Sequence, residues 1–186
     1  MNKDRLENTR DYFENITKAA YRQFMAGEVT FLAVYSLATG LYHIGEWMCV
    51  HDLAKVQAKF GAGIVKSADL WHQVVEKHVP DAGFIRDLNN AAKHAKLTFP
   101  TKKGGPSTAM HHSANTFIQT TGYGEGGYGE GPYGGGPEVK MDEGGREVQL
   151  EPIATAVFHF WEALVEEFYA TPAAVVVTAG PPTANS

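Results

Sequence analysis

Residues 29–51 form the longest apolar stretch of the chain and constrain its fold most strongly. Apolar side chains fall on almost every side of a helix drawn through this stretch, which is typical of a helix at the centre of a bundle. Its most apolar part, about Val29 to Tyr42, is interrupted by Thr and Ser residues and followed by His43 and Glu46, so it is too short and too polar at its end to cross a bilayer. It therefore predicts the central helix of a helical bundle with no membrane association.

Other segments with helical spacing of apolar residues predict the helices that surround this centre. They are residues 2–26, 52–60, 67–79, 82–97 and 151–169. Gly61 and Gly63 are natural stops for the helix at 52–60. Pro100 follows the helix at 82–97 closely and limits its extension. The chain is thus predicted to be mainly α-helical.

The segment between the last two helices, residues 98–150, has a different character. Residues 114–121 have the β-branched and aromatic content of a strand. In residues 138–150, apolar and polar side chains alternate on both sides of Gly144 and Gly145, which predicts a β-hairpin with its turn at these glycines. The Gly- and Tyr-rich stretch 122–136 is interpreted as a long loop, although its three tyrosines also allow stacking on RNA bases. We expect one domain over residues 1–170, followed by a flexible tail at 171–186.

Charge and cysteine content narrow the class of protein. Residues 1–100 hold 12 Lys/Arg and 11 Asp/Glu, whereas residues 101–186 hold 4 Lys/Arg and 10 Asp/Glu. This balance disfavours DNA binding over the whole surface of the protein, because such binding needs an excess of positive charge. The single cysteine, Cys49, excludes an internal disulfide and fits a reducing compartment. The first residues are charged and lack the apolar core of a secretory signal, so a cytoplasmic location is expected.

The helix predicted at 82–97 carries the densest group of polar side chains. On a helix, several of them fall within a band about 100° wide and could converge on one ligand. Arginine offers a planar fork to phosphate or carboxylate, and histidine can transfer a proton near neutral pH. The plainer alternative is an internal salt bridge with a histidine at a packed interface. The residues of this group are Arg86, Asp87, Asn89, Asn90, Lys93 and His94.

The chain contains the stretches LYHIGEW at 41–47, FIRDLNNAAKH at 84–94 and an aromatic-glycine stretch before EVKMDEGGREV. These stretches resemble the HEPN superfamily (higher eukaryotes and prokaryotes nucleotide-binding domain), and in particular uncharacterised bacterial HEPN-like proteins. The resemblance covers most of residues 10–169. It implies a HEPN-like helical bundle with a small antiparallel β-hairpin insertion before the last helix.

Catalytic members of that superfamily are metal-independent endoribonucleases that place two copies of an Arg, polar residue, four to six residues, His motif across a dimer interface. The resemblance implies Arg86 as the phosphate ligand, Asp87 as the polar position and His94 as the acid or base. Asn90, Lys93 and Asn89 would then bind the ligand. Seven residues separate Arg86 from His94, which we interpret as a longer gap than the motif has.

Two function classes follow. The first hypothesis is a non-catalytic nucleotide-binding, ligand-binding or protein-interaction module that uses the polar face of the helix at 82–97. The alternative is a metal-independent endoribonuclease of a defence or toxin–antitoxin system. A homodimer is expected in either case, because a polar helix face is readily shared across a two-fold axis.

Metal and cofactor chemistry is not expected. No P-loop, GxSxG, CxxC or HExxH pattern occurs in the sequence. His43 and Glu46, like His159 and Glu162, have a spacing related to that of di-metal carboxylate bundles, but further bridging carboxylates are lacking. His43 and Glu46 are therefore assigned a supporting role. His72 and His78 are expected to be solvated on a helix flank.

Overall fold

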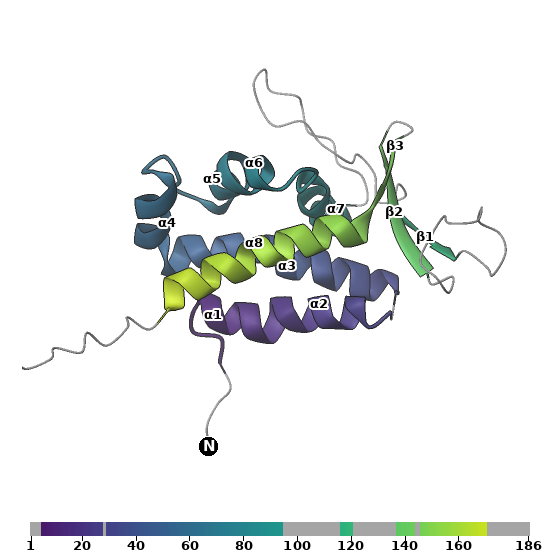
Figure 1. Ribbon diagram of the computed structural model, residues 1–186, viewed down its shortest axis with the longest axis horizontal. Coiled ribbons are helices and arrows are strands. Elements are labelled where there is room, and N and C mark those ends of the chain that lie inside the picture. Colours follow the sequence, from purple (N-terminus) through teal and green to yellow (C-terminus); the bar gives the residue numbers. More distant parts are fainter. Residues whose placement is uncertain (1–4, 28, 95–115, 121–136, 144–145, 171–186) are drawn as a thin grey trace, which may run out of the picture.

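The computed structural model describes residues 5–27, 29–94, 116–120, 137–143 and 146–170. This part of the chain is mainly helical and carries one three-stranded antiparallel sheet (Figure 1). The predicted fold class is confirmed at that level.

Helix α3, Phe31–His51, lies at the centre of the bundle as predicted. Thr30 caps its start, because the Thr30 hydroxyl accepts a hydrogen bond from the backbone N–H of Ala33 at 3.1 Å. Helices α2, α5, α7 and α8 all pack against α3. Its fully buried large side chains are Val34, Leu37, Leu41, Ile44 and Met48. The long apolar stretch therefore supplies the core around which the other helices are arranged.

The N-terminal helical segment differs from the single helix predicted at 2–26. It begins at Thr9, with Asn8 as its N-cap, and consists of α1 (Thr9–Tyr12), a π-helical turn η1 (Phe13–Thr17) and α2 (Lys18–Met25). The Thr17 hydroxyl donates a hydrogen bond to the carbonyl of Gly40 in α3 at 2.9 Å. A Cβ on Gly40 would lie 3.3 Å from the Cα of Thr17, so a glycine is needed for this close approach.

The remaining helices match the predicted segments closely. Helix α4 ends at Gly61, whose φ of 107° favours glycine. The predicted helix at 67–79 is interrupted by a second π-helical turn, η2. Helices α1 and α2 form one layer, α3 and α8 the middle, and α4 to α7 the opposite layer (Figure 1). The bounds are α4 Leu53–Phe60, α5 Ser67–Leu70, η2 Trp71–Val75, α6 Glu76–His78, α7 Gly83–His94 and α8 Leu150–Tyr169.

The sheet contains the predicted hairpin and one more strand. Strands β2 (Pro137–Glu143) and β3 (Arg146–Gln149) pair antiparallel, and Glu143 faces Arg146 across the turn, as the Gly144–Gly145 prediction requires. Strand β1 (Thr116–Thr120) pairs with the other edge of β2. The inserted unit is therefore a three-stranded sheet rather than a hairpin alone. The Gly- and Tyr-rich stretch 122–136 lies outside the described residues.

Two tryptophans meet beside a glycine in the middle of α3. The indole N–H of Trp71 donates to the Tyr42 carbonyl at 3.0 Å, and that of Trp161 donates to the Leu41 carbonyl at 2.9 Å. Their rings lie 6.0 Å apart in an edge-to-face arrangement, and both are fully buried. A Cβ on Gly45 would lie only 3.2 Å from the Nε1 of Trp71. Gly45 thus makes room for the pair.

Replacing Gly45 by Ala is expected to lower the free energy of unfolding by about 1 kcal/mol. Alanine improves helix propensity, but Trp71 is held by its hydrogen bond and by Trp161 and has little freedom to move away. Gly63→Ala is the matched control, because a Cβ there meets nothing nearer than a Gln73 oxygen at 3.8 Å. Urea unfolding measures both variants, and equal stability of the two would contradict the expectation.

A buried carboxylate joins the first and last helices at one end of the bundle. Asp52 lies between α3 and α4 and is 5% exposed. It accepts hydrogen bonds from the hydroxyl groups of Thr9 at 2.6 Å and Tyr169 at 2.8 Å, and it pairs with Lys55 at 2.9 Å. Burial raises the pKa of Asp52, but hydrogen bonds from Thr9, Lys55 and Tyr169 together outweigh burial, so its pKa is lowered.

This lowered pKa predicts an acid-dependent loss of stability. The contribution of the Asp52 carboxylate is fully present above its pKa in the unfolded chain, about 3.9, and is lost as the pH falls through its lower folded value. Asp52→Asn should therefore be less stable than the wild type at pH 7, and the difference should narrow at acid pH. Urea unfolding of both proteins between pH 7 and pH 3 checks this, and a difference that does not depend on pH would contradict it.

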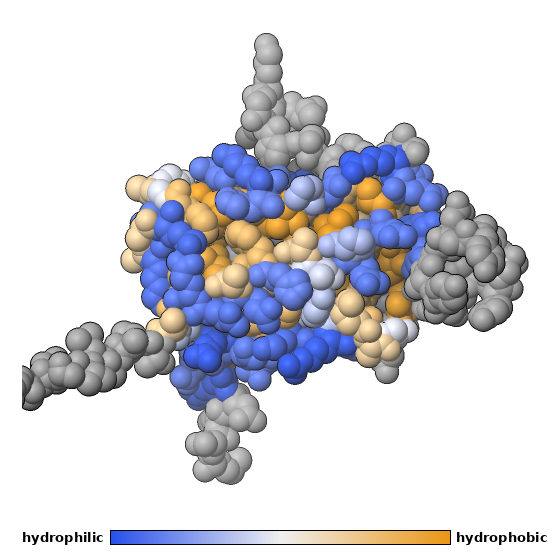
Figure 2. All heavy atoms as spheres, viewed as in Figure 1, coloured by the Kyte–Doolittle hydropathy of each residue, from blue (hydrophilic) through white to orange (hydrophobic). Residues whose placement is uncertain are grey.

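Within the described part of the chain, no helix combines the length and the apolar composition that a bilayer crossing needs. Hydrophobic residues are visible across the middle of the face shown in Figure 2, where α8 runs, and hydrophilic residues lie along α1 and α2. The face shown in Figure 2 is thus mixed in character, with hydrophilic residues along both of its long edges.

Candidate functional site

The predicted polar helix exists as α7, Gly83–His94, and its polar residues Arg86, Asp87 and Asn89 are buried. It follows a turn in which Asp81 adopts a φ of 64°, and the Asp81 carboxylate pairs with Arg146 of β3 at 2.7 Å. Arg86 is 8% exposed and Asp87 is 1% exposed. The polar band therefore faces the interior of the bundle more than solvent.

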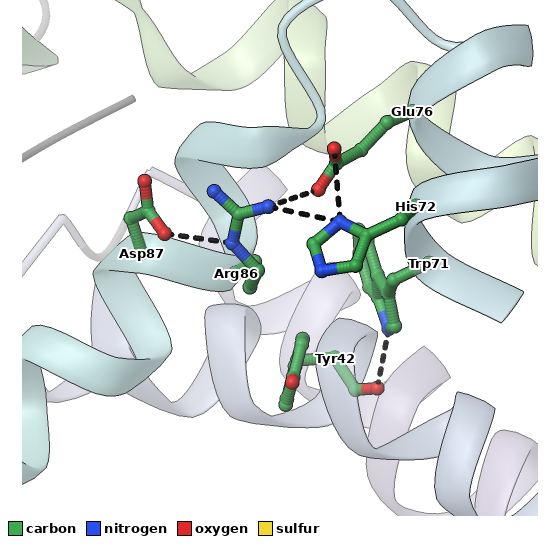
Figure 3. A network of polar contacts seen from close by, with 6 residues as sticks. All are labelled: Tyr42, Trp71, His72, Glu76, Arg86 and Asp87. Atoms are coloured by element: carbon green, nitrogen blue, oxygen red, sulfur yellow. Dashed lines mark hydrogen bonds and ion pairs between the residues drawn. The ribbon is translucent and has the colours of Figure 1, made fainter. Parts of the chain in front are cut away.

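Arg86 lies at the centre of a polar cluster, hereafter the Arg86 cluster, made with Asp87, Glu76 and His72 (Figure 3). Its Nε donates to the Asp87 carboxylate at 2.7 Å, and its Nη1 donates to the Glu76 carboxylate. Nη1 also lies 3.3 Å from the His72 Nδ1, which is 3.2 Å from the other Glu76 oxygen. The internal salt bridge of Arg86 with Asp87, considered as the plainer alternative, is confirmed.

The π-helical turn η2 brings the opposite half of this cluster into place. Trp71 begins η2 and is anchored to the Tyr42 carbonyl of α3, so the residues that follow have a fixed direction. His72 and Glu76 then lie one turn apart and face Arg86 (Figure 3). Short π-helical segments are frequent at functional sites. The side chains of His72 and Glu76 are 30% and 22% exposed, so this edge of the cluster reaches solvent.

The electrostatics of the cluster hold the arginine charged. Burial lowers the pKa of Arg86, but the hydrogen bond and charge of Asp87 and the charge of Glu76 outweigh burial, so its pKa is raised. Among the described residues, the guanidinium of Arg86 is thus paired with two carboxylates beside the imidazole of His72. A phosphate group that approached Arg86 would therefore meet the two carboxylates with which Arg86 is already paired.

Asn89 and Asn90 differ in their surroundings. Asn89 is fully buried, and its side-chain oxygen accepts a hydrogen bond from the Thr39 hydroxyl of α3 at 3.1 Å. The Asn89 amide nitrogen has no hydrogen-bond partner among the described residues. Asn90 is partly exposed. Asn89 thus joins α7 to α3, whereas Asn90 is the asparagine that a ligand can reach.

The side chains of Lys93 and His94 lie outside the described residues, although the backbone of α7 extends to His94. The interpretation of the gap before His94 as too long for the motif was wrong. With Asp87 as the polar position, six residues precede His94, which is within the four to six of the motif. The observation that argues against catalysis is instead the pairing of Arg86 with two carboxylates.

The supporting pair, His43 and Glu46, lies on α3. The His43 Nδ1 is 2.7 Å from a Glu46 oxygen, and the Glu46 side chain is 52% exposed. His159 and Glu162 form a similar pair at 3.1 Å on α8. Within the described ranges, no group of three or more His, Cys, Asp or Glu residues has the arrangement of a metal site.

His72 and Glu76 are the residues that sequence reasoning missed. The prediction that His72 is simply solvated was wrong, because His72 belongs to the Arg86 cluster. His78 is exposed, as predicted, and its Nδ1 lies 2.7 Å from the Val74 carbonyl one turn earlier. The available signal was the spacing of His72 and Glu76 in WHQVVEKH, which places both on one helix face.

Comparison of the chain with family models, with curated proteins and with solved structures gives no match.

Proposed function

We propose that this protein is a non-catalytic ligand-binding module, with HEPN-like character, whose site is the solvent-facing edge of the Arg86 cluster. The observation that carries the proposal is the pairing of the buried Arg86 with Asp87 and Glu76. Because the guanidinium of Arg86 is already paired, its role is to hold the neighbouring side chains in position. His72 and Glu76, which reach solvent, would make the direct contacts with the ligand.

The charge of the cluster indicates the class of ligand. Carboxylate oxygens accept hydrogen bonds, and the imidazole of His72 can donate one and accept another. Such a set suits a neutral polar ligand with several donors, such as the base and ribose of a nucleoside. Two carboxylates beside one arginine disfavour a phosphate group in the same place. We therefore propose nucleoside-type recognition in which the phosphate lies away from Glu76.

A titration with matched ligands tests this. A nucleoside should bind at least as tightly as its 5′-monophosphate, and amide NMR signals of residues 72–76 and 83–90 should shift on binding. Glu76→Gln removes one negative charge and should reverse the preference in favour of the monophosphate. Tighter binding of the monophosphate to the wild type, or signal changes confined to other residues, would contradict the proposal.

The ribonuclease alternative is tested separately with mixed RNA in EDTA. We expect no cleavage by the wild type. The reaction needs a guanidinium that binds the phosphate of the RNA, and the guanidinium of Arg86 is already paired with carboxylates. Cleavage by the wild type that is lost in His72→Ala, with the fold retained, would overturn the non-catalytic proposal.

The homodimer is part of the same proposal, and sedimentation velocity of the full chain checks it.

A further inference from the structure

One ring nitrogen of His72 lies between two partners with opposite hydrogen-bonding demands (Figure 3). The Nδ1 of His72 is 3.3 Å from the Nη1 of Arg86 and 3.2 Å from the Oε2 of Glu76. A guanidinium can only donate hydrogen bonds, and a carboxylate can only accept them. Nδ1 carries either a lone pair or a hydrogen, so it can satisfy Arg86 or Glu76 but not both at once.

Burial decides which partner the neutral imidazole satisfies. The Arg86 side chain is 9% exposed, so the N–H that it directs at His72 is withdrawn from water. The Glu76 side chain is 22% exposed, so its carboxylate can also accept hydrogen bonds from water. An unsatisfied buried donor costs more free energy than an acceptor that water can reach. We therefore expect neutral His72 to accept from Arg86 at Nδ1 and to carry its hydrogen on Nε2.

Uptake of a proton by His72 reverses this choice. Both ring nitrogens of an imidazolium are donors, so Nδ1 can no longer accept from Arg86 and donates to Glu76 instead. His72 and Arg86 are then two cations whose nitrogens lie 3.3 Å apart, which favours a movement of the ring away from Arg86. The His72 side chain is 30% exposed, so the ring has a solvent-facing side toward which it can move.

The other charged or titratable groups at the cluster keep their protonation near neutral pH. Among the described residues they are Glu76 of α6, Arg86 and Asp87 of α7, and Tyr42 of α3. Burial raises the pKa of the Tyr42 hydroxyl, so this group stays protonated. Ordinary carboxyl and guanidinium groups do not titrate between pH 8 and pH 6, whereas imidazole does. Imidazole is therefore the group of this cluster that responds to pH in that range.

We propose that His72 is a proton-controlled switch that determines which ligands the Arg86 cluster accepts. The consequence for ligands rests on the proposed function, in which the carboxylate of Glu76 disfavours a phosphate group. Neutral His72 stays on Arg86 and leaves that negative charge in place. Protonated His72 places a second cation against Glu76 and offsets its charge. A nucleotide that carries a phosphate should therefore bind better at pH 6 than at pH 8.

Nitrogen-15 NMR of the full chain tests the switch without any ligand. At pH 8 the Nδ1 of His72 should carry no hydrogen, and at pH 6 it should carry one, while the Nε signal of Arg86 shifts in step. His72→Gln should abolish the pH-dependent shift of Arg86. A hydrogen on the Nδ1 of His72 at pH 8 would overturn the proposal. An Arg86 signal that does not follow pH, or that still follows it in His72→Gln, would also overturn it.

His159 is the matched internal control for this experiment. Its Nδ1 lies 3.1 Å from the Glu162 carboxylate one turn away, as the Nδ1 of His72 does from Glu76, but no arginine contacts it among the described residues. The Nδ1 of His159 should therefore carry a hydrogen at both pH values. Identical behaviour of the two histidines would show that Arg86 does not control the hydrogen on His72.

Two probes extend the test to ligands: adenosine, and the methyl ester of adenosine 5′-monophosphate, whose single negative charge is constant between pH 6 and pH 8. In the wild type, the affinity for the ester relative to adenosine should rise at least about threefold from pH 8 to pH 6. In His72→Gln this ratio should not change. A constant ratio in the wild type would overturn the switch even if adenosine binds. If neither probe bound, the proposed function would fail, and the NMR experiment would still decide whether the switch exists.

Discussion

Replacing Arg86 by Ala is expected to lower the free energy of unfolding by about 3–5 kcal/mol. The substitution removes the guanidinium that donates to Asp87 and Glu76, while the Asp87 carboxylate stays almost fully buried. A buried carboxylate that loses a charged donor keeps its cost of desolvation. Urea unfolding followed by circular dichroism measures the change.

Arg146→Ala is the matched control for this substitution. Arg146 also makes an arginine–carboxylate pair, with Asp81, but its side chain is 63% exposed. Exposed pairs contribute about 0–1 kcal/mol, so the control should lose much less stability than Arg86→Ala. Similar losses in the two variants would show that the burial of Arg86 has no energetic consequence. Arg86→Lys should recover only part of the stability, because lysine lacks the planar fork that reaches two carboxylates.

Replacing Trp71 by Ala should have a comparably large effect, about 3–5 kcal/mol. The ring is fully buried between Gly45 and Trp161, so its removal leaves a cavity in the centre of the bundle. Trp71 also begins η2, so its loss should displace His72 from Arg86. Urea unfolding measures the loss of stability, and the NMR signals of residues 72–76 report the displacement of His72.

Two further substitutions separate the contributions of Trp71. Trp71→Phe keeps most of the ring volume but removes the donor to the Tyr42 carbonyl, so a loss of about 1 kcal/mol is expected. Trp47→Ala removes a partly buried tryptophan that stacks on Tyr12 at the surface and should also cost about 1 kcal/mol. If Trp71→Ala cost no more than Trp47→Ala, the tryptophan pair would not be central to the core.

The order and limits of most helices could be predicted because the relevant signals are local. The apolar stretch at 29–51 corresponds to α3, and Gly61 ends α4 where a positive φ is required. Alternation around Gly144 and Gly145 was sufficient to predict the pairing of β2 with β3. The two π-helical turns were not predicted; Thr17 of η1 and Trp71 of η2 each donate a hydrogen bond to a carbonyl of α3.

The candidate site was predicted in part. The sequence predicted helix α7. It also indicated the pairing of Arg86 with Asp87 as the alternative to a ligand site, because these residues are neighbours on one helix. It did not identify His72 and Glu76 as their partners. These residues are ten or more positions away from Arg86 along the chain. Only the packing of η2 and α7 against α3 brings them together.

The sequence by itself therefore determined which segments become helices and strands, since side-chain periodicity and backbone propensity act over a few neighbouring residues. The tertiary structure alone decided which way the polar residues of α7 face. Arg86 turns inward because two carboxylates and an imidazole, supplied partly by another segment, satisfy a charge that burial would otherwise disfavour. Such compensation depends on distances between remote segments, and no local pattern encodes those distances.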